Sequence, residues 1–390
     1  MDLDALAKSP IGRLVPISGT DGRTGRHYDY FAYLADPLPQ SVELSPSAWT
    51  AVVRAEAALA RLDQASRQIP DPSLLRRPAL RREAQSTSAL EGTFAPFVDV
   101  LQPEVEDRAQ LSLVIREILN YVFAAEHAFE WVTDRPLTGG FLGALQGFLV
   151  QGTGGEYSDA GGLRDRQVLI GPADTAIEEA RFVPAPFGDQ LRAGLDDWIG
   201  WIGTPDRDLP AVVQVALAHY QFETLHPFSD GNGRIGRLAI VLHMMRLGVL
   251  KEPILVVSPW FEARRAEYQD QLLQLSQTGD WESWIRFFAA AVEASATKTH
   301  QQIESLLAWQ QHALRVVREA GASGVAERVA SELIGNPVRR AGQVAARYGV
   351  SHQGGMNALR RLVELGLVAE ESRSGRVVFS AGDVVNLLSA

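Results

Sequence analysis

One glycine-rich stretch, residues 226–237, holds most of the side chains that could do chemistry. It reads His-Pro-Phe-Ser-Asp-Gly-Asn-Gly-Arg-Ile-Gly-Arg. Residues 231–233 stand where a helix is expected to begin, so their backbone N–H groups and the positive end of the helix dipole would face the loop. Arg234 and Arg237 lie three residues apart on the first turn, and guanidinium groups bind phosphate oxygens in a bidentate way. The pattern predicts a phosphate site.

Two more side chains of this stretch could complete a site for phosphoryl chemistry. Asp230 is a carboxylate among phosphate binders, which favours a ligand for a Mg²⁺ that bridges those phosphates. His226 stands at the edge of the loop and can act as a base near neutral pH. A single His is usually a satisfied polar residue, and Gly-Asn-Gly alone is usually a turn. The case for chemistry therefore depends on all these residues occurring together.

Two helices are expected to position this loop. Asp208 and Pro210 have the pattern of an N-cap and a first-turn proline ahead of an apolar run. This helix should end near His226, because the proline that follows lacks a donor and restricts its neighbour. The second helix is predicted over residues 234–247 and ends before Gly248. The expected arrangement is helix, tight loop, helix.

The stretch resembles the signature of the Fic (filamentation induced by cAMP) family, His-Pro-Phe-x-Asp/Glu-Gly-Asn-Gly-Arg-x-x-Arg, and matches it at every fixed position. The resemblance implies transfer of AMP from ATP to a hydroxyl of a protein Ser, Thr or Tyr, with release of pyrophosphate. It implies that His226 is the base, Phe228 packs the loop, Asp230 holds Mg²⁺, Gly231, Asn232 and Gly233 form the anion hole, Arg234 contacts the phosphates and Arg237 holds the γ-phosphate.

An upstream helix is predicted from Pro78, in its first turn, to Glu91, with Gly92 at its end. Its periodicity places Glu91 on the apolar face, where an unpaired carboxylate is costly. The residues from Thr87 to Gly92 also resemble the inhibitory motif of Fic proteins, Ser/Thr-x-x-x-Glu-Gly/Asn. In the family this Glu pairs with the second Arg of the signature, here Arg237, so the resemblance implies autoinhibition. The alternative is an ordinary surface Glu at a helix end.

Residues 164–171 are predicted to form a strand, with a partner strand at residues 180–184. The Fic resemblance implies that this hairpin is a flap beside the active site, which clamps a target segment by strand addition. The residues assigned to the flap are Gln167, Val168, Leu169 and Ile170. A hairpin with a purely structural role is the alternative.

A further helix is predicted from Ser258 through Leu275. Tyr268 and Leu272 lie four residues apart on one of its faces and could line an adenine pocket. This sequence departs from many Fic relatives, which carry a second Tyr where Gln269 stands. Packing in the core is the alternative for both residues.

The composition is that of a globular chain, with 46% hydrophobic and 22% charged residues among 390. The net charge of −10 argues against nucleic-acid binding over the whole surface, although one basic module is not excluded. Cys is absent, which excludes disulfides, thiolate catalysis and Cys-ligated zinc. The N-terminus lacks a signal-peptide pattern, and no stretch reaches the roughly 18 apolar residues of a membrane span. A cytoplasmic protein is expected.

The two ends of the chain differ from its centre. Residues 1–45 lack sustained periodicity and are expected to be an extended arm that packs through its aromatics, followed by a helix over residues 46–68. From Gly335 onward there are seven Arg against four acidic residues. Two short helices around a turn at Gly349, followed by a hairpin, resemble a winged helix-turn-helix.

This C-terminal segment could bind DNA or another protein. On its second predicted helix, His352, Gln353 and Asn357 could reach base edges. Four arginines could lie near phosphates: Arg360, Arg361, Arg373 and Arg376. Because winged helices also serve as protein-docking modules, protein binding is the alternative.

These patterns predict a mostly α-helical chain with three parts. They are an N-terminal extension with the inhibitory helix (1–105), a Fic catalytic core with a β-hairpin flap (106–320) and a winged helix-turn-helix (325–390). The predicted function is that of a protein adenylyltransferase, which uses ATP and Mg²⁺, acts on a target protein and on itself, and is held inactive by Glu91. The alternatives are an enzyme that removes AMP and a DNA-binding regulator with a nucleotide-sensing Fic core. DNA contact through residues 335–390 and a homodimer are further expectations.

Overall fold

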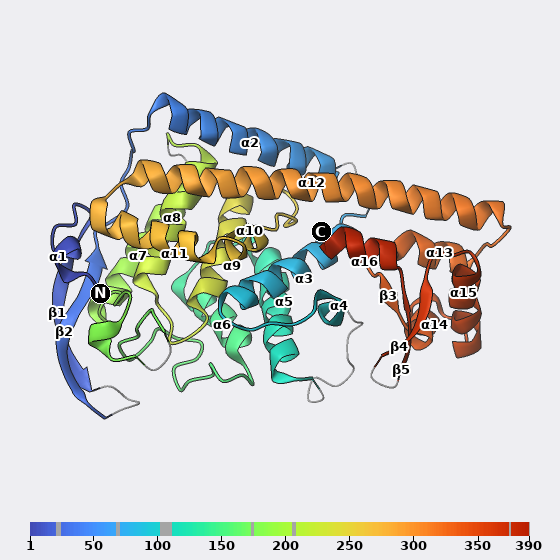
Figure 1. Cartoon of the computed structure of the whole chain (residues 1–390), viewed down its shortest axis with the longest axis horizontal. Coiled ribbons are helices and arrows are strands. Elements are labelled where there is room, and N and C mark those ends of the chain that lie inside the picture. Colours follow the sequence, from blue (N-terminus) through green and yellow to red (C-terminus); the bar gives the residue numbers. More distant parts are fainter. Residues whose placement is uncertain are drawn as a thin grey trace. The chain divides into compact units, whose positions relative to one another are not determined.

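The computed structural model describes residues 1–20, 25–67, 71–101, 111–172, 175–204, 208–373 and 376–389. Helices dominate, as predicted (Figure 1). The helices are α1 (Leu3–Leu6), α2 (Pro46–Arg67), α3 (Ser73–Leu90), α4 (Phe97–Val100), α5 (Leu113–Val132), α6 (Gly139–Val150), η2 (Ile177–Glu179), α7 (Asp189–Ile202), α8 (Ala211–Leu225), α9 (Asn232–Arg246), α10 (Ser258–Glu262), α11 (Arg265–Thr278), α12 (Trp281–Glu319), α13 (Val325–Glu332), α14 (Ala341–Tyr348), α15 (His352–Glu364) and α16 (Gly382–Ser389). The strands are β1 (Gly12–Thr20), β2 (His27–Ala35), β3 (Val338–Arg339), β4 (Ala369–Arg373) and β5 (Arg376–Ser380).

The chain divides into two compact units. Unit 1 contains Met1–Ala60, Asn120–Lys251 and Trp260–Ala294, and unit 2 contains Arg61–Leu119, Glu252–Pro259 and Ser295–Ala390. Helices α2, α5, α10 and α12 contribute residues to both units. The domain boundaries proposed from the sequence stay a prediction. Within the described part of the chain, no helix has both the length and the apolar character needed to cross a membrane.

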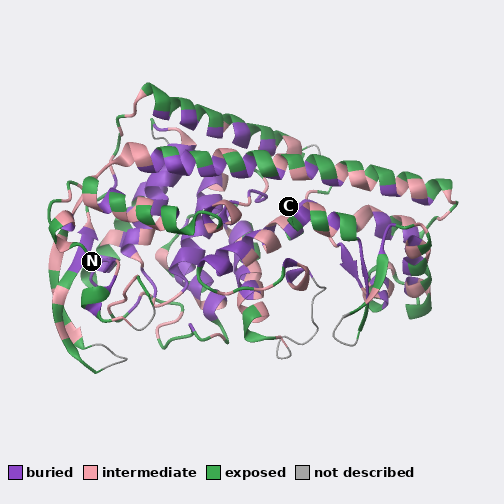
Figure 2. Cartoon of the chain, viewed as in Figure 1, coloured by how far each residue is buried: buried purple, intermediate pink, exposed green. Residues whose placement is uncertain are grey.

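Helix α8 is the centre of unit 1. Its apolar residues are spread around the whole helix, as is typical of a helix that is buried on all sides, and nearly all of it is buried (Figure 2). Helices α7 and α9 and strand β2 pack against it. The ring of Trp198 on α7 lies 5.3 Å from that of Phe222, and the ring of Trp284 on α12 lies 6.2 Å from that of His219. The C-terminal end of α8 is therefore held by packing from several directions.

The N-terminus of α8 is capped from a distance, so the prediction that Asp208 is its N-cap is wrong. Pro210 occupies the N-cap position. The N–H of Val212 donates to Oε1 of Glu56 on α2 at 2.8 Å. A cap supplied by another helix leaves no local signal in the sequence around residue 208.

A β-hairpin forms near the N-terminus, where the sequence predicted only an extended arm. Strands β1 and β2 pair antiparallel, with Gly12 opposite Ala35. Strand β2 alternates between exposed and half-buried residues as far as Phe31, and then residues 32–34 are all buried. The period-2 signal of this strand is interrupted because its second half lies against the core, and this explains the missed hairpin.

The predicted flap hairpin is reduced to a single bridge. Ile170 and Phe182 exchange two backbone hydrogen bonds of 2.9 and 3.0 Å, and the prediction of a strand over residues 164–171 is wrong. The two residues after Phe182 do not extend the pairing with residues 164–171. The carbonyl of Val183 accepts from the N–H of Tyr33 at 2.9 Å, and the proline at position 184 has no N–H to donate.

Helix α3 of unit 2 begins earlier than predicted, and Pro78 lies inside it rather than in its first turn. At the start, Oδ1 of Asp71 accepts from the N–H of Ser73 at 3.1 Å. Pro78 cannot donate to the carbonyl of Leu74, and Gly335 packs there instead: a Cβ on Gly335 would lie 2.4 Å from the Leu74 oxygen. The helix therefore tolerates its proline where a second segment packs against the affected turn.

The C-terminal part of unit 2 contains the two helices and the turn predicted there. Helix α14 ends at Gly349, which has φ +66°, and Oγ of Ser351 accepts from the N–H of Gly354 at 3.1 Å to begin α15. Strands β3, β5 and β4 follow each other in one antiparallel sheet. Strands β4 and β5 pair antiparallel, with Ala369 opposite Ser380, and form the hairpin predicted after the two helices. Residues 374–375 of the predicted wing lie outside the described residues.

Candidate active site

His226 ends helix α8 in a left-handed conformation, with φ 50° and ψ 61°. Among the described residues it is the one non-glycine residue with positive φ. Its N–H still donates to Phe222 at 2.9 Å, and its Nδ1 lies 3.2 Å from the carbonyl oxygen of Glu223. A carbonyl oxygen only accepts, so in the neutral imidazole the proton is assigned to Nδ1 and the lone pair to Nε2. The turn thus presents the imidazole in the tautomer that a base needs.

Asn232 fixes the shape of the loop with its side chain. Its Oδ1 accepts from the N–H of Phe228 at 2.8 Å, and its Nδ2 donates to the carbonyl of the same residue at 2.7 Å. Phe228 is fully buried, as predicted, with its ring 6.4 Å from that of Phe222. Because the amide of Asn232 is used in this way, its predicted part in an anion hole falls to its backbone N–H.

Helix α9 begins at Asn232 and brings two buried cations to the loop. Gly231 has φ +84°, and a Cβ there would lie 2.7 Å from Cδ2 of Leu149, so both conformation and space require glycine. The first N–H groups of a helix have no partner within it, and that end is electropositive. Arg234 and Arg237 on the first turns are each only 2% exposed. This combination suits an anion, and anion binding by residues 231–237 stays a prediction.

Asp230 stands beside these cations with an accessible carboxylate. Its Oδ1 accepts from the N–H of Gly231 at 2.6 Å and lies 3.4 Å from Nη2 of Arg234, while its side chain is 40% exposed. Gly155 makes room for Oδ2, since a Cβ there would lie 1.7 Å from it. The described residues contain no group of three His, Cys, Asp or Glu that could hold a metal ion. A single carboxylate nevertheless fits Mg²⁺ when nucleotide phosphates supply the other ligands.

Arg164 is a positioning residue that no pattern in the sequence singles out. It is buried, and its guanidinium donates to four backbone carbonyls. Nε donates to His226 at 2.8 Å and Nη1 to Arg166 at 3.0 Å. Nη2 donates to Ala185 and to Leu225. Burial lowers its pKa to about 9, and nearby Asp159 opposes that shift. Arg164 therefore ties the carbonyl of His226 to the segment around the flap residues.

Two other side chains brace the same loop. Gln146 of α6 is buried, donates from Nε2 to the carbonyl of Asp230 at 3.1 Å and accepts from the N–H of Gly161 at 2.8 Å. Asp159 accepts from Oγ of Ser229 at 2.6 Å. Both come from segments more than 60 residues upstream of the loop, so only the fold reveals them.

The residues assigned to the flap, Gln167, Val168, Leu169 and Ile170, are all half-buried. Nε2 of Gln167 donates to the carbonyl of Pro184 at 2.9 Å, which keeps the two arms together beyond the bridge. Capture of a target segment by these residues stays a prediction.

Tyr268 lies in an aromatic cluster of unit 1. It is 4% exposed, its ring stacks 4.6 Å from that of Phe261, and its hydroxyl lies 2.8 Å from Nε2 of His219. Burial, and secondarily the charge of Arg237, lower the pKa of His219 to about 3, so this His is neutral. These contacts agree with the alternative in which Tyr268 packs in the core. Leu272 is half-buried, and a role at adenine stays a prediction.

The helix predicted from Ser258 through Leu275, which carries Tyr268, is divided into α10 and α11. Arg264 leaves helical geometry with φ −127° and ψ 33° between them.

Comparison with protein families agrees with this geometry. Residues 49–130 match the Fic/DOC family N-terminal model, and residues 136–244, which include the whole motif loop, match the Fic/DOC family model. The chain carries a Fic domain.

Relatives of the Fic domain include the protein adenylyltransferase fic-1 of Caenorhabditis elegans, 33% identical over 138 residues, and the protein adenylyltransferase Fic of Culex quinquefasciatus, 31% identical over 142 residues. Each match covers 35% of this chain, and the chain spans about a quarter of those relatives, 24% of each.

Two solved structures share the fold. A Fic family protein from Desulfovibrio desulfuricans has a TM-score of 0.55 at 19% identity, covering 87% of this chain and 97% of that one. The C. elegans fic-1 structure has a TM-score of 0.51 at 19% identity, covering 67% of this chain and 75% of that one.

The predicted inhibitory residues lie within the Fic N-terminal match. Thr87 is buried in α3, and Gly92 has φ +94° just after the helix. Glu91 is the C-cap and is exposed, so the prediction that it lies on the apolar face of the helix is wrong. The helix stops at Leu90, and helical periodicity therefore does not set the direction of the Glu91 side chain.

Proposed function

We propose that this chain is a protein adenylyltransferase that transfers AMP from ATP to a hydroxyl of a target protein. One observation carries the proposal: His226, in the left-handed turn that ends α8, stands directly before a helix start that holds two buried arginines. A base next to an anion site suits attack of a hydroxyl on a phosphate. The names of the relatives support the same activity.

In the proposed reaction, Nε2 of His226 takes the proton of the target hydroxyl. The hydroxyl oxygen bonds to the α-phosphorus of ATP, the bond from that phosphorus to the bridging oxygen breaks, and pyrophosphate leaves. The N–H groups at the start of α9, with Arg234 and Arg237, stabilise the charge on the phosphates. Asp230 would hold Mg²⁺, which neutralises phosphate charge when bound.

The hydrogen bonds around the loop explain how the base is held in place. Asn232 closes the loop on Phe228, and Arg164 holds the carbonyl of His226 in its left-handed conformation. Holding the reacting groups close to their productive geometry supplies most of the rate enhancement that orientation can give.

Arg164→Met should lower AMP transfer by about a hundredfold, because the carbonyl of His226 loses its donor and a small displacement of the base is costly. It should also destabilise the protein by about 3 kcal/mol, since several buried carbonyls lose partners. Arg164→Lys should retain part of the activity, because one ammonium cannot reproduce the planar set of donors. Transfer rates and thermal unfolding measure the two effects.

Arg166→Met is the matched control, because Arg166 lies two residues away with a side chain that is 44% exposed. It should change transfer by less than about threefold, as is usual for surface substitutions. Wild-type transfer by Arg164→Met would show that the loop holds its shape without this clamp.

We also propose that Glu91 restrains the enzyme, as the inhibitory-motif resemblance implies, by occupying Arg237 so that the γ-phosphate cannot use it. Support comes from the motif itself and from the position of Glu91 at the end of α3, where Gly92 has the conformation of a helix-terminating glycine.

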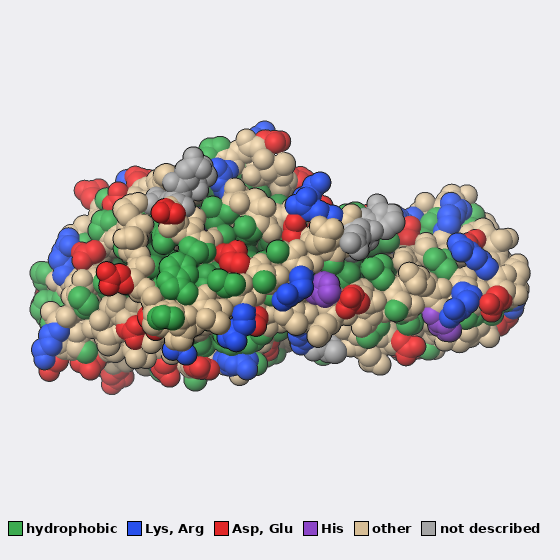
Figure 3. Space-filling view, turned by 90° about the horizontal axis from the view of Figure 1, so that it is seen from above, with side chains coloured by type: hydrophobic (Ala, Val, Ile, Leu, Met, Phe, Trp, Pro, Cys, Tyr) green, Lys and Arg blue, Asp and Glu red, His purple; other side chains and the backbone are tan. Residues whose placement is uncertain are grey.

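A second proposal concerns DNA binding by residues 335–390. On α15, His352, Gln353, Asn357 and Arg360 are exposed, and in Figure 3 Lys and Arg side chains gather at the right-hand end, where Figure 1 draws α13–α15. Several of the arginines counted in the sequence have other partners, however. Arg339 and Arg347 pair with Glu332, and Arg361 pairs with Glu364.

The affinity of the full chain for duplex DNA should fall steeply with salt, because each neutralised phosphate releases counterions. Arg360→Ala should reduce the slope of log affinity against log salt by about one unit, whereas Arg361→Ala, whose guanidinium is already paired, should change it little. Fluorescence anisotropy from 50 to 200 mM salt, about the range over which such slopes are resolved, measures this. Absence of binding at the lowest salt would favour protein docking.

A further inference from the structure

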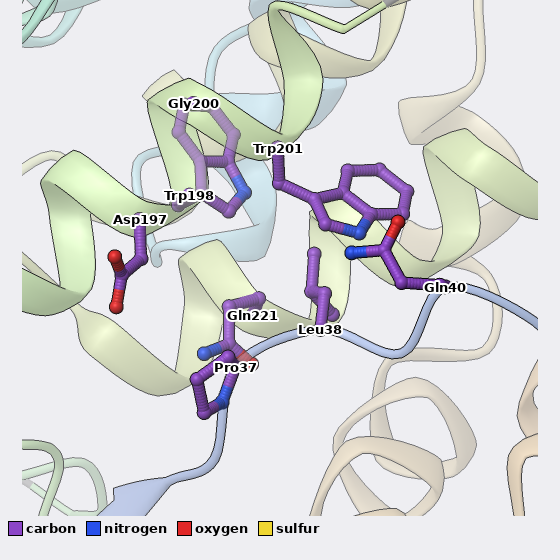
Figure 4. A pocket seen from close by; sticks show the side chains of 8 residues that line it. All are labelled: Pro37, Leu38, Gln40, Asp197, Trp198, Gly200, Trp201 and Gln221. Atoms are coloured by element: carbon purple, nitrogen blue, oxygen red, sulfur yellow. The ribbon is translucent and has the colours of Figure 1, made fainter. Parts of the chain in front are cut away.

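A separate cavity of about 300 Å³ lies within unit 1. It is lined by the segment after β2 (Pro37, Leu38, Gln40), by α7 (Asp197, Trp198, Gly200, Trp201) and by Gln221 of α8 (Figure 4). None of these residues belongs to the motif loop. The volume is at the lower end of the range for small-molecule sites.

Two buried tryptophans supply the apolar walls. The indole N–H of Trp198 donates to the carbonyl of Ala218 at 2.8 Å, and that of Trp201 donates to the carbonyl of Pro39 at 3.3 Å. With both N–H groups bound to backbone, the indoles offer the cavity their hydrocarbon and π surfaces. Such surfaces bind apolar groups and attract cations.

The buried polar group of the cavity is an acceptor. Gln221 is only 5% exposed, and its Nε2 donates to the carbonyl of Asp36 at 3.2 Å. Its Oε1 receives no hydrogen bond from the described residues, although it belongs to a side chain that lines the cavity. Among the described residues this oxygen is not one of the fully buried acceptors that lack a partner, so it is accessible and can accept a hydrogen bond from a ligand N–H.

The rim carries a negative charge that no lining residue balances. Asp197 is exposed on α7, and the described residues give it no ion pair. No Lys or Arg lines the cavity. Figure 4 shows the Asp197 carboxylate on one side and the indole of Trp201 on the other, with Gln221 and Leu38 between them. An anionic ligand would be repelled here, and nucleotides are therefore poor candidates.

We propose that this cavity binds a small organic ammonium ion with an apolar or aromatic body. The ammonium would donate to Asp197 and to Oε1 of Gln221, and the body would lie against Trp198 and Trp201. This site is distinct from the phosphate site, which is built from helix N–H groups and arginines, and it does not depend on the proposed AMP transfer.

Gly200 lines the cavity and has open space where a side chain would begin. A Cβ built on Gly200 meets no atom within 4 Å, and the residue lies in the interior of α7 with an ordinary helical backbone. Gly200→Leu should therefore fold, since Leu favours helix over Gly, while it occupies space at the lining of the cavity.

Isothermal titration of the full chain with phenethylammonium chloride, and with neutral 2-phenylethanol, tests the proposal. The ammonium should bind and the alcohol should bind at least about tenfold more weakly, because a charge-assisted hydrogen bond is lost. Asp197→Asn should weaken ammonium binding by a similar factor, and Gly200→Leu should abolish it. Asp196→Asn, which changes an exposed neighbour that does not line the cavity, should leave binding within twofold. No binding by the native chain, equal binding of the alcohol, or equal loss in both Asp variants would overturn the proposal.

Discussion

Glu91→Gly should raise AMP transfer by about a hundredfold while ATP affinity changes only a few-fold. If Glu91 occupies Arg237, the γ-phosphate loses its anchor and ATP binds with its α-phosphorus turned away from the incoming hydroxyl. Misalignment of this kind costs orders of magnitude in rate even when binding survives. Transfer to the chain itself and to lysate proteins, measured beside ATP affinity by calorimetry, separates the two effects.

The companion variants test whether Glu91 acts through Arg237. Glu91→Asp should be intermediate, because the shorter carboxylate reaches less well. Arg237→Ala should be inactive with or without Glu91, which is the non-additivity expected of coupled residues. Since Arg237 is buried, thermal melting must show that this variant is folded. Unchanged transfer by Glu91→Gly would leave Glu91 as a surface cap or as part of a hydrolytic site.

His226→Ala should reduce AMP transfer by about 10²–10⁴-fold with ATP binding nearly intact, because the residue is required only to take a proton. His226→Asn is the sharper variant. Asn tolerates the left-handed conformation that position 226 adopts, so it should preserve the turn while it removes the base.

Single-turnover transfer and ATP titration on both variants provide the measurement. Equal loss in Ala and Asn assigns the effect to the missing base. A transfer rate within a few-fold of the native rate in either variant would contradict the role given to His226.

The sequence predicted most of what lies close together along the chain. Pro227 marks the end of α8 and Gly231 the start of α9, and the residues between them share one loop, so the sequence alone predicted that these side chains lie together. The helix ends at Gly248 and Gly349 follow the same logic, because a left-handed residue ends a helix locally.

What the sequence did not predict depends on contacts between distant segments. Arg164 reaches His226 across 62 residues, and Glu56 caps α8 from 156 residues away. Strand β2 lost its alternation where it meets the core. Pro78 was predicted in a first turn, and the segment at Gly335 that packs against the Leu74 carbonyl lies far along the chain. The cavity beside Trp198 combines three segments, none of which carries a motif.

The most direct test of the account uses the Glu91→Gly chain with ATP labelled at either the α- or the γ-phosphate, incubated with cell lysate and analysed by gel and mass spectrometry. Transfer of AMP predicts that label enters protein from α-³²P-ATP and not from γ-³²P-ATP, that the added mass is that of AMP, and that His226→Asn abolishes both signals. Label entering from the γ-phosphate, or no label from either nucleotide in a chain that binds ATP, would contradict the assignment as a protein adenylyltransferase.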